Sequence, residues 1–514
     1  MKSLKKKLVA TALLVSIPAA ALAADGIGPF TNGVLTANPA VGAPANVVSS
    51  DFTATQVVTG TDPLENPSGV ITTFGKLSNG TNTEPDQNIY VIIPDGVKGP
   101  TPKYNYGTHF LFQGHELFAG NQAYVTRVNL DVTDPAHRIT LLTPVGGDGL
   151  THLSSLDGIT YNASTKTLLV TQEASSTTGG VIEVDPKVVG KVTTHYGSMG
   201  RCGVEGVHVD NKGHVYLVED AGGTSASNDK NNINGSVKVA KQPNSYVYRF
   251  LPYQAKNLSA GGKLQALQVS VDGSPLTFGG TTADQVFADV WSGKQRLLHS
   301  GKNFPTKWVT IHDTATDGTT DFDCNAAART AGATPFKRPE NGVFAPNGKY
   351  DTFFFAITGD TNNLSGSVPE LAARGAWGGI FEVNFKNDNE GRIKMIVRGD
   401  ADHNSFDNVT MGDSNTLLAS EDRGDTLHDQ LNALDSIWAY PLNNLSSPLR
   451  LLAQGRDVSA SAAGLEDNEP TGIHVSNGGI TKADTVGTAG NLPNARGFFT
   501  QQHGDNTIYE LVHK

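Results

Sequence analysis

Residues 204–220 read VEGVHVDNKGHVYLVED, two apolar runs joined by the turn Asp210-Asn-Lys-Gly213. The first run opens with a carboxylate, Glu205, and the second closes with Glu219 and Asp220. Two antiparallel strands joined by a turn bring the start of the first strand and the end of the second to one end of the hairpin. This stretch therefore predicts a β-hairpin that presents its carboxylates at one rim.

The same arrangement occurs at four other places along the chain. The additional pairs are Asp157-Gly-Ile with Glu173, Glu340-Asn-Gly-Val with Asp360, Asp407-Asn-Val with Glu421-Asp422, and Glu469-Pro-Thr-Gly-Ile with His503-Gly-Asp505. A single acidic residue near a turn is more often a solvated loop residue than a ligand. Chance would scatter such residues over both strand ends, whereas the repeats keep them at one end, so we expect them to lie on a common rim.

Repeated hairpins with companion strands, spaced by tens of residues, are typical of a β-propeller. An earlier pair of apolar runs, Leu117 to Asp131 and Ile139 to Pro144, adds one unit to the repeats. We therefore predict an all-β fold, a six-bladed β-propeller with insertions. One insertion contains a short helical segment from Thr282 to Leu298. A β-sandwich array or a β-helix is the alternative fold.

The first residues follow the pattern of a secretory signal. Four lysines within the first seven residues precede an apolar run from Leu8 to Ala21 and the tripeptide Ala21-Leu22-Ala23. We expect residues 1–23 to be a Sec-type signal peptide, which makes the mature protein periplasmic or secreted. We expect residues 24–105 to be a loosely ordered N-terminal segment that wraps the domain, and residues 106–514 to form the propeller.

Charge and cysteine content narrow the range of partners. The formal net charge is −11, and cleavage of the signal would remove four lysines and make the chain more acidic. Acidic surfaces repel nucleic acid and anionic lipid, so we expect neither as a partner. We expect a monomer. Cys202 and Cys324 are the two cysteines, and an oxidising compartment would allow them to form one disulfide.

The predicted rim is also a predicted metal centre. The innermost strands of a propeller start near its central channel, where ligands and metals usually bind. Buried carboxylates without a cation would be strongly destabilised by repulsion and desolvation, and Ca²⁺ takes six to eight oxygen ligands. We expect more than one ion, with calcium as the first candidate. The predicted ligands are Asp157, Glu173, Glu205, Glu340, Asp407, Glu421, Glu469 and His503.

Arg338 lies two residues before Glu340, with Pro339 between them. A guanidinium beside metal-bound carboxylates offers the fork of donors that a phosphoryl or carboxylate substrate needs. The alternative is that Arg338 only neutralises the acidic rim. The sequence contains no G-x-S-x-G elbow, no H-E-x-x-H, no C-x-x-C and no Walker loop. Catalysis would therefore depend on metal ions.

Several motifs together resemble the PhoX family of secreted bacterial alkaline phosphatases, from about Thr108 to the C-terminus. They are Gly200-Arg201 with Glu205-Gly206, Lys337-Arg338-Pro339-Glu340, Phe406-Asp407-Asn408 with Ala419-Ser420-Glu421-Asp422, Glu469-Pro-Thr-Gly472 with Gln502-His503, and Leu251-Pro-Tyr-Gln254. The resemblance implies a six-bladed propeller whose axial site holds iron and calcium and hydrolyses phosphate monoesters. It implies Glu205 and Glu340 as iron ligands and Arg338 as the phosphate-binding residue. These three are the predicted catalytic residues. It also implies that Glu173, Asp407, Glu421 and Glu469 bind or bridge calcium.

Two features depart from that family. A cysteine precedes the glutamate that matches Glu173 and bridges the irons, whereas this chain has Gln172 there. Glutamine supplies no thiolate, which puts the paired-iron centre in doubt, and Cys202 near Glu205 is the other available thiol. The family also uses twin-arginine export, which the N-terminus here does not indicate.

We therefore predict an exported, metal-dependent phosphomonoesterase. The alternatives are a calcium-stabilised propeller that binds without catalysis and a different metal-dependent hydrolase, such as a lactonase.

Overall fold

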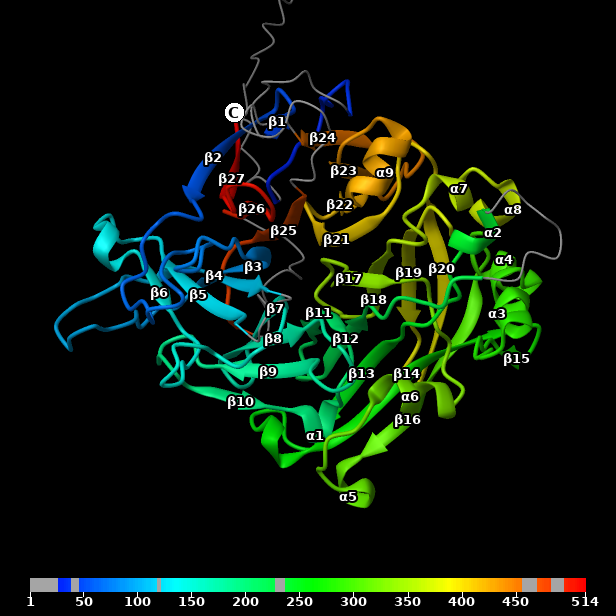
Figure 1. Cartoon of the computed structure of the whole chain (residues 1–514), viewed down its shortest axis with the longest axis horizontal. Helices are drawn as coiled ribbons and strands as arrows, with labels where there is room; N and C mark the ends of the chain where they lie inside the picture. The colour runs from blue at the N-terminus through cyan, green and yellow to red at the C-terminus, as the bar shows by residue number, and fades with distance from the viewer. Residues whose placement is uncertain (1–25, 38–45, 118–121, 227–235, 455–468, 482–493) are drawn as a thin grey trace, which may run out of the picture.

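The structure is a computed structural model that describes residues 26–37, 46–117, 122–226, 236–454, 469–481 and 494–514. The predicted signal peptide, residues 1–23, lies outside the described residues. Strands dominate the described part, and its helices are few and short (Figure 1). None of the helices in these ranges is long and apolar enough to cross a membrane.

Four antiparallel sheets of four or five strands are arranged like the blades of a propeller (Figure 1). The first contains β3 (Glu84–Ile92), β4 (His109–Glu116), β5 (Tyr124–Asn129) and β6 (Ile139–Leu141). The second contains β7 (Leu156–Asn162), β8 (Thr167–Gln172), β9 (Gly180–Val184) and β10 (Val192–Thr194). The third contains β21 (Phe406–Met411), β22 (Thr416–Glu421), β23 (Ser436–Pro441), β24 (Leu449–Gln454) and β1 (Asn46–Val48). The fourth contains β25 (Pro470–Ser476), β26 (Arg496–Gln501), β27 (Ile508–His513) and β2 (Phe52–Val58).

The fifth sheet has ten strands. Its order is β11 (Val204–Val209), β12 (Val215–Glu219), β13 (Val247–Pro252), β14 (Gly262–Val271), β16 (Phe304–Asp313), β20 (Glu390–Arg398), β19 (Gly379–Phe385), β18 (Thr352–Ile357) and β17 (Pro339–Phe344). The short β15 (Ser274–Pro275) pairs with β14. The sheet curls until its first strand, β11, contacts its last, β17, so it is nearly closed.

One strand from each hairpin lies at the centre of the molecule. Each of β3, β7, β11, β17, β21 and β25 contacts the next, and β25 contacts β3, so these strands form a closed ring (Figure 1). The predicted carboxylate rim lies at the start of these strands. The propeller-like, all-β prediction is therefore confirmed.

Apolar runs without alternation fill the space between neighbouring sheets. Phe353 and Phe355 of β18 belong to one buried cluster, whereas Phe354 and Ala356 belong to another. A strand covered on both faces reads as a continuous apolar run. The core therefore lies between neighbouring sheets and inside the curled ten-stranded sheet, and the polar residues at the strand starts face the axis.

Two helices occupy the insertion that the sequence predicted to be helical, α3 (Ala283–Val290) and α4 (Gly293–Leu298). Thr282 and Gln285 form a capping box at the start of α3, which explains where this helix begins. The other helical turns lie in the connections between strands: η1 (Pro135–His137), α1 (Tyr196–Met199), α2 (Ser236–Val239), η2 (Leu258–Ala260), α5 (Thr314–Asp317), α6 (Cys324–Thr330), α7 (Asn363–Gly366), α8 (Pro369–Ala372) and α9 (Gly424–Leu431).

The N-terminal segment differs from the prediction. The expected boundary near residue 105 separates β3 from β4, although these two strands pair in one sheet. In the same segment β1 pairs with β24 and β2 pairs with β27. The described strands of residues 24–105 are therefore integral parts of three sheets, because their backbone groups are satisfied by ladder hydrogen bonds.

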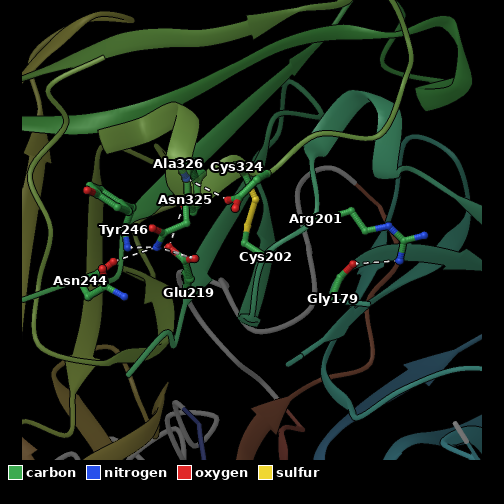
Figure 2. Close-up of a disulfide and its surroundings, with 11 residues drawn as sticks. Gly179, Arg201, Cys202, Glu219, Asn244, Tyr246, Cys324, Asn325 and Ala326 are labelled. Atoms are coloured by element: carbon green, nitrogen blue, oxygen red, sulfur yellow. Dashed lines mark hydrogen bonds between the residues drawn. A yellow bond between two sulfur atoms is a disulfide. The ribbon is translucent and has the colours of Figure 1, made fainter. Parts of the chain in front are cut away.

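Cys202 and Cys324 form a disulfide, with their Cα atoms 5.8 Å apart (Figure 2). The bond joins the segment before β11 to the start of α6 across 122 residues of sequence. Both cysteines are buried in an apolar cluster. The possible disulfide is therefore confirmed, and Cys202 has no free thiolate to offer an iron ion.

Replacing both cysteines by alanine should lower the free energy of unfolding by about 2–4 kcal/mol, because a long loop is no longer closed in the unfolded chain. Urea unfolding of the double variant and of the wild type measures the difference. An unchanged midpoint and slope would show that the disulfide does not stabilise the fold.

Candidate metal centre

Each of the six inner hairpins has a β-bulge near the start of its first strand. In five of them the first residue of the bulge, directly after the paired residue at the strand start, is acidic: Asp86, Asp157, Glu205, Glu340 and Asp407. In the sixth hairpin the register shift comes one residue later, after Thr471. Thr471 is nevertheless the equivalent position, because it follows Pro470 in the same way as Glu340 follows Pro339. A bulge redirects a side chain that regular pairing would leave on a sheet face. The repeated bulge thus supplies one axial polar group per hairpin.

A second polar residue stands at or directly after the end of the outgoing strand of each hairpin. These residues are Glu116, Glu173, Asp220, Thr358, Asp422 and Gln502. All of them except Thr358 line the same cavity as the acidic bulge residues, and Thr358 donates a hydrogen bond to Glu340. Both ends of each hairpin therefore contribute to one site.

The cavity has a volume of about 280 Å³. Arg338, Gln502 and His503 line it together with eleven carboxyl side chains: Glu84, Asp86, Glu116, Asp157, Glu173, Glu205, Asp220, Glu340, Asp407, Asp422 and Glu469. Four sets of three carboxyl groups have ligand atoms within 4.8 Å of one another: Asp86, Asp407 and Glu469; Asp86, Glu116 and Asp157; Asp157, Glu173 and Glu205; and Glu205, Glu340 and Asp407.

Burial and mutual repulsion disfavour the ionised form of these groups. Desolvation, followed by the charge of Glu340, raises the pKa of Glu205 well above its ordinary value. Desolvation and the charge of Asp220 raise the pKa of Glu173 to about 8. Desolvation also raises the pKa of Asp407 to about 6. Without cations the cluster must therefore bind protons near neutral pH.

Two buried carboxyl oxygens, Asp157 Oδ1 and Asp220 Oδ1, have no hydrogen-bond partner among the described residues. A buried, unsatisfied polar atom is costly, so such atoms at a cavity wall indicate a missing ligand. The donors are carboxyl oxygens, apart from the amide of Gln502 and the imidazole of His503. Hard cations such as Ca²⁺ prefer oxygen donors, so the residues present fit a calcium-type centre.

Thr471 replaces the sixth bulge carboxylate and lies between two of the others. Its hydroxyl oxygen is 3.0 Å from Asp86 Oδ1 and 2.7 Å from Asp407 Oδ2. A hydroxyl has one hydrogen and donates it to one acceptor at a time. Thr471 therefore relieves the repulsion between its two neighbours without adding a charge.

Arg338 brings positive charge into the cavity. Its Nε donates to Asp220 Oδ2 at 2.9 Å, and its Nη2 lies 3.5 Å from Glu340 Oε1. The backbone at Arg338 has a φ of +50°, in the left-handed region that residues other than glycine seldom adopt. Ser155, Ser405 and Glu469, each two residues before a bulge position, also have positive φ. This backbone conformation is therefore a repeated feature of the strand starts.

Seven of the eight predicted metal ligands line the cavity: Asp157, Glu173, Glu205, Glu340, Asp407, Glu469 and His503. Glu421 does not, because its buried carboxylate accepts hydrogen bonds from Arg423 and from the backbone N–H of Asn404. Successive side chains of a strand point to opposite faces, and the neighbouring Asp422 lines the cavity instead. Glu421 is therefore replaced by Asp422 in the candidate ligand set.

Two other expected rim residues also lie elsewhere. Asp360 forms a fully buried salt bridge with Lys337, with 2.7 Å between Oδ1 and Nζ. Asp505 is exposed and is not among the cavity-lining residues. Neither contributes a ligand to the described cavity.

The prediction missed the contribution of the first hairpin, namely Glu84, Asp86 and Glu116. The composition of residues 24–105 predicts a loosely ordered segment and no site residue. The signal was present in Glu84-Pro-Asp86, which precedes the apolar run Tyr90-Val-Ile-Ile in the manner of the other hairpins.

Gln172, at the expected cysteine position, points away from the cavity lining. Its Nε2 donates to Ser154 O at 3.2 Å, and its Oε1 accepts from the hydroxyl of Tyr196. It therefore contributes no ligand to the carboxylate cluster in this structure.

Comparisons with known proteins identify one family. The model of the family described as alkaline phosphatase PhoX matches residues 151–476. No curated protein sequence matches the chain. Two solved structures of Trichoderma reesei carbohydrate-active enzymes of family AA12, one with iodide and one with calcium, are similar over 93% of this chain and over 100% and 99% of their own length. They are 10% and 11% identical, with TM-scores of 0.29 and 0.30, values too low to support an inference.

Stability of the metal-stripped protein should fall as the pH rises from about 4.5 to about 8. A carboxyl group whose folded-state pKa is raised, such as Glu173 at about 8 against an ordinary 4.5, binds a proton in the folded chain that the unfolded chain has already released. Thermal unfolding in EDTA at several pH values measures the slope, and added Ca²⁺ should reverse it. Glu173→Gln should flatten the slope. A chelated protein that gains stability over this range would contradict the account.

Thr471→Val should weaken metal binding and lower the stability of the metal-free protein by about 1–3 kcal/mol, because Asp86 and Asp407 lose their shared donor. Thr471→Ser retains the hydroxyl and is the matched control. Calcium titration calorimetry and chelated melts compare the two variants. Equal values for valine and serine would exclude a role for the hydroxyl.

Proposed function

This chain belongs to the PhoX alkaline phosphatase family, and from that membership we propose that it is a metal-dependent phosphomonoesterase acting at the acidic cavity. The cavity is a concave site with convergent polar groups and strongly shifted carboxyl groups, which is what catalytic sites commonly present. Glu205, Glu340 and Arg338 remain the proposed catalytic residues.

We also propose that the architecture is a six-bladed propeller. The ten-stranded sheet contains two runs of four strands, β11 to β14 and β17 to β20, which β16 joins. If each run is one blade, the four other sheets complete six. The closed ring of six inner strands supports this division.

The observation that carries the functional proposal is Arg338 among the carboxylates. A phosphate dianion would be repelled by eleven carboxyl groups unless cations and a guanidinium offset them. Asp220 accepts a hydrogen bond from Nε of Arg338. A guanidinium carries five N–H groups, so its other groups could donate to an incoming phosphoryl oxygen.

The residues proposed to hold cations are those of the four close carboxyl sets. Glu205, Asp157, Asp86 and Asp407 each belong to two sets, so each is suited to a bridging position between ions. Bound cations would neutralise the phosphoryl oxygens and lower the barrier to attack by water. Calcium is the proposed metal. Iron is the family-based candidate, but Gln172 supplies no thiolate for a paired-iron centre.

In this proposal the protein residues position the phosphoryl group and neutralise its charge. Asp220 fixes the guanidinium of Arg338, and Arg338 would orient the phosphoryl group toward the cations that Glu340 and Glu205 would hold. Thr358, which donates to Glu340, restrains that carboxylate. We further propose that the protein is exported by the signal at residues 1–23 and acts as a monomer on a small phosphorylated substrate, without binding nucleic acid or membranes.

Arg338→Ala should reduce kcat/KM for p-nitrophenyl phosphate by about 10²–10³, in the range seen when one preorganised donor is removed. Arg338→Lys should recover part of this loss, because lysine keeps the charge and loses the fork of donors. Arg496→Lys, at a salt bridge with Glu510 outside the cavity lining, is the control and should be neutral. Unchanged rates for Arg338→Ala would dismiss the assignment.

Turnover of p-nitrophenyl phosphate, bis-p-nitrophenyl phosphate and a lactone panel, with and without chelator, separates this proposal from the alternatives. We expect hydrolysis of the monoester that EDTA abolishes and added metal restores. A melting temperature that EDTA lowers, with no ester cleaved, would indicate a calcium-stabilised binding propeller. Cleavage of lactones alone would indicate a lactonase.

A further inference from the structure

A second hollow, of about 610 Å³, adjoins the acidic cavity. Glu173 and Asp220 line both spaces. Asp220 is also the residue that accepts the hydrogen bond from Arg338 Nε. The second hollow therefore begins beside the guanidinium to which the proposed function assigns the phosphate.

The walls of this hollow carry hydroxyl, amide and carboxyl groups. Ser154, Ser175, Ser176 and Thr178 contribute hydroxyl groups, and Asn325 of α6 contributes an amide. Four carboxyl groups, those of Glu173, Glu219, Asp220 and Asp323, also line it, and the lining includes no lysine, arginine or histidine among the described residues. The hollow thus suits a hydroxylated group and repels a second negative charge.

Its walls are held in place by contacts within the chain. The disulfide of Cys202 and Cys324 joins them, and Asn325 Nδ2 donates to Glu219 Oε1 at 2.9 Å (Figure 2). Another lining residue, Ser154, is held by Gln172, whose Nε2 donates to Ser154 O at 3.2 Å. Gln172 therefore supports the second hollow rather than the metal centre.

We propose that this hollow is the leaving-group subsite, and that it accepts neutral or cationic, polyhydroxylated alcohols of phosphate monoesters. The inference rests on the proposed function. Hydrolysis breaks the bond between phosphorus and the ester oxygen, joins phosphorus to a water oxygen, and releases the alcohol with one proton from that water. With the phosphoryl group at Arg338, the alcohol occupies the adjoining space, where the serine and threonine hydroxyls and the Asn325 amide are hydrogen-bonding partners.

Two substrates test this assignment directly, because glycerol 3-phosphate and 3-phosphoglycerate differ by one hydroxymethyl group replaced by a carboxylate. We expect kcat/KM to be higher for glycerol 3-phosphate by about tenfold or more, since the lining holds acidic residues such as Asp323 and no basic side chain that would balance a carboxylate on the leaving group. The rates are measured on metal-loaded full-length protein, with p-nitrophenyl phosphate as the reference ester.

Substitutions of residues that line the second hollow make the test more specific. Asp323 caps α6 by accepting from the backbone N–H of Ala326 at 2.9 Å, and asparagine caps equally well. Asp323→Asn should therefore lower the ratio of kcat/KM for glycerol 3-phosphate to that for 3-phosphoglycerate several-fold, without loss of the helix cap. Ser176→Lys should lower this ratio further. Asp321→Asn, two residues earlier and outside the lining, is the control and should leave all rates unchanged.

The outcomes separate this proposal from the proposed function. Cleavage of p-nitrophenyl phosphate together with equal rates for the two natural esters, or a preference that Asp323→Asn and Ser176→Lys leave unchanged, would overturn the subsite alone. Failure to cleave any of the three esters in metal-loaded protein would overturn the phosphatase proposal and the subsite with it.

Discussion

Repulsion among the buried carboxyl groups at the axis is the constraint on which the rest of the structure depends. Eleven carboxyl groups line one cavity, seven of them from buried residues, and burial raises the cost of ionising them. The ring of inner strands fixes their positions, because each bulged strand contacts the inner strand on either side of it. The chain can satisfy this arrangement only with protons or cations, and cations are available at the pH where the carboxyl groups would otherwise ionise.

The repeat of axial carboxylates around the ring is interrupted at two positions, and these positions make one part of the cavity different from the rest. Thr471 takes the place of a sixth carboxylate, and Arg338 brings a guanidinium in at a strained backbone conformation. Asp220 connects Arg338 to the second hollow, whose walls the disulfide joins. The proposed phosphate binding and the proposed leaving-group recognition thus both depend on Arg338 and on its contact with Asp220.

Much of the fold and of the candidate site could be predicted from the sequence, and the incorrect predictions have physical causes. Turn-connected hairpins such as 204–220 reveal both strands at once, so their carboxylates were found. The strand β3 is separated from β4 by a loop of sixteen residues with its own bridge between Lys98 and Asn105, and the pairing of β3 with β4 is not a local signal. Glu421 and Asp422 are adjacent, and which of them faces the axis depends on bulge register, which the sequence pattern does not show. The role of β16 in joining two sets of strands depends on long-range pairing with β20.

Elemental analysis of the purified mature protein, after gel filtration in metal-free buffer, tests the central claim most directly. The account predicts more than one tightly bound metal ion per chain, with calcium among them. It also predicts that Glu205→Gln, which removes a ligand shared by two carboxyl sets, lowers that number. A wild-type protein that retains no metal and melts at the same temperature with and without EDTA would contradict it.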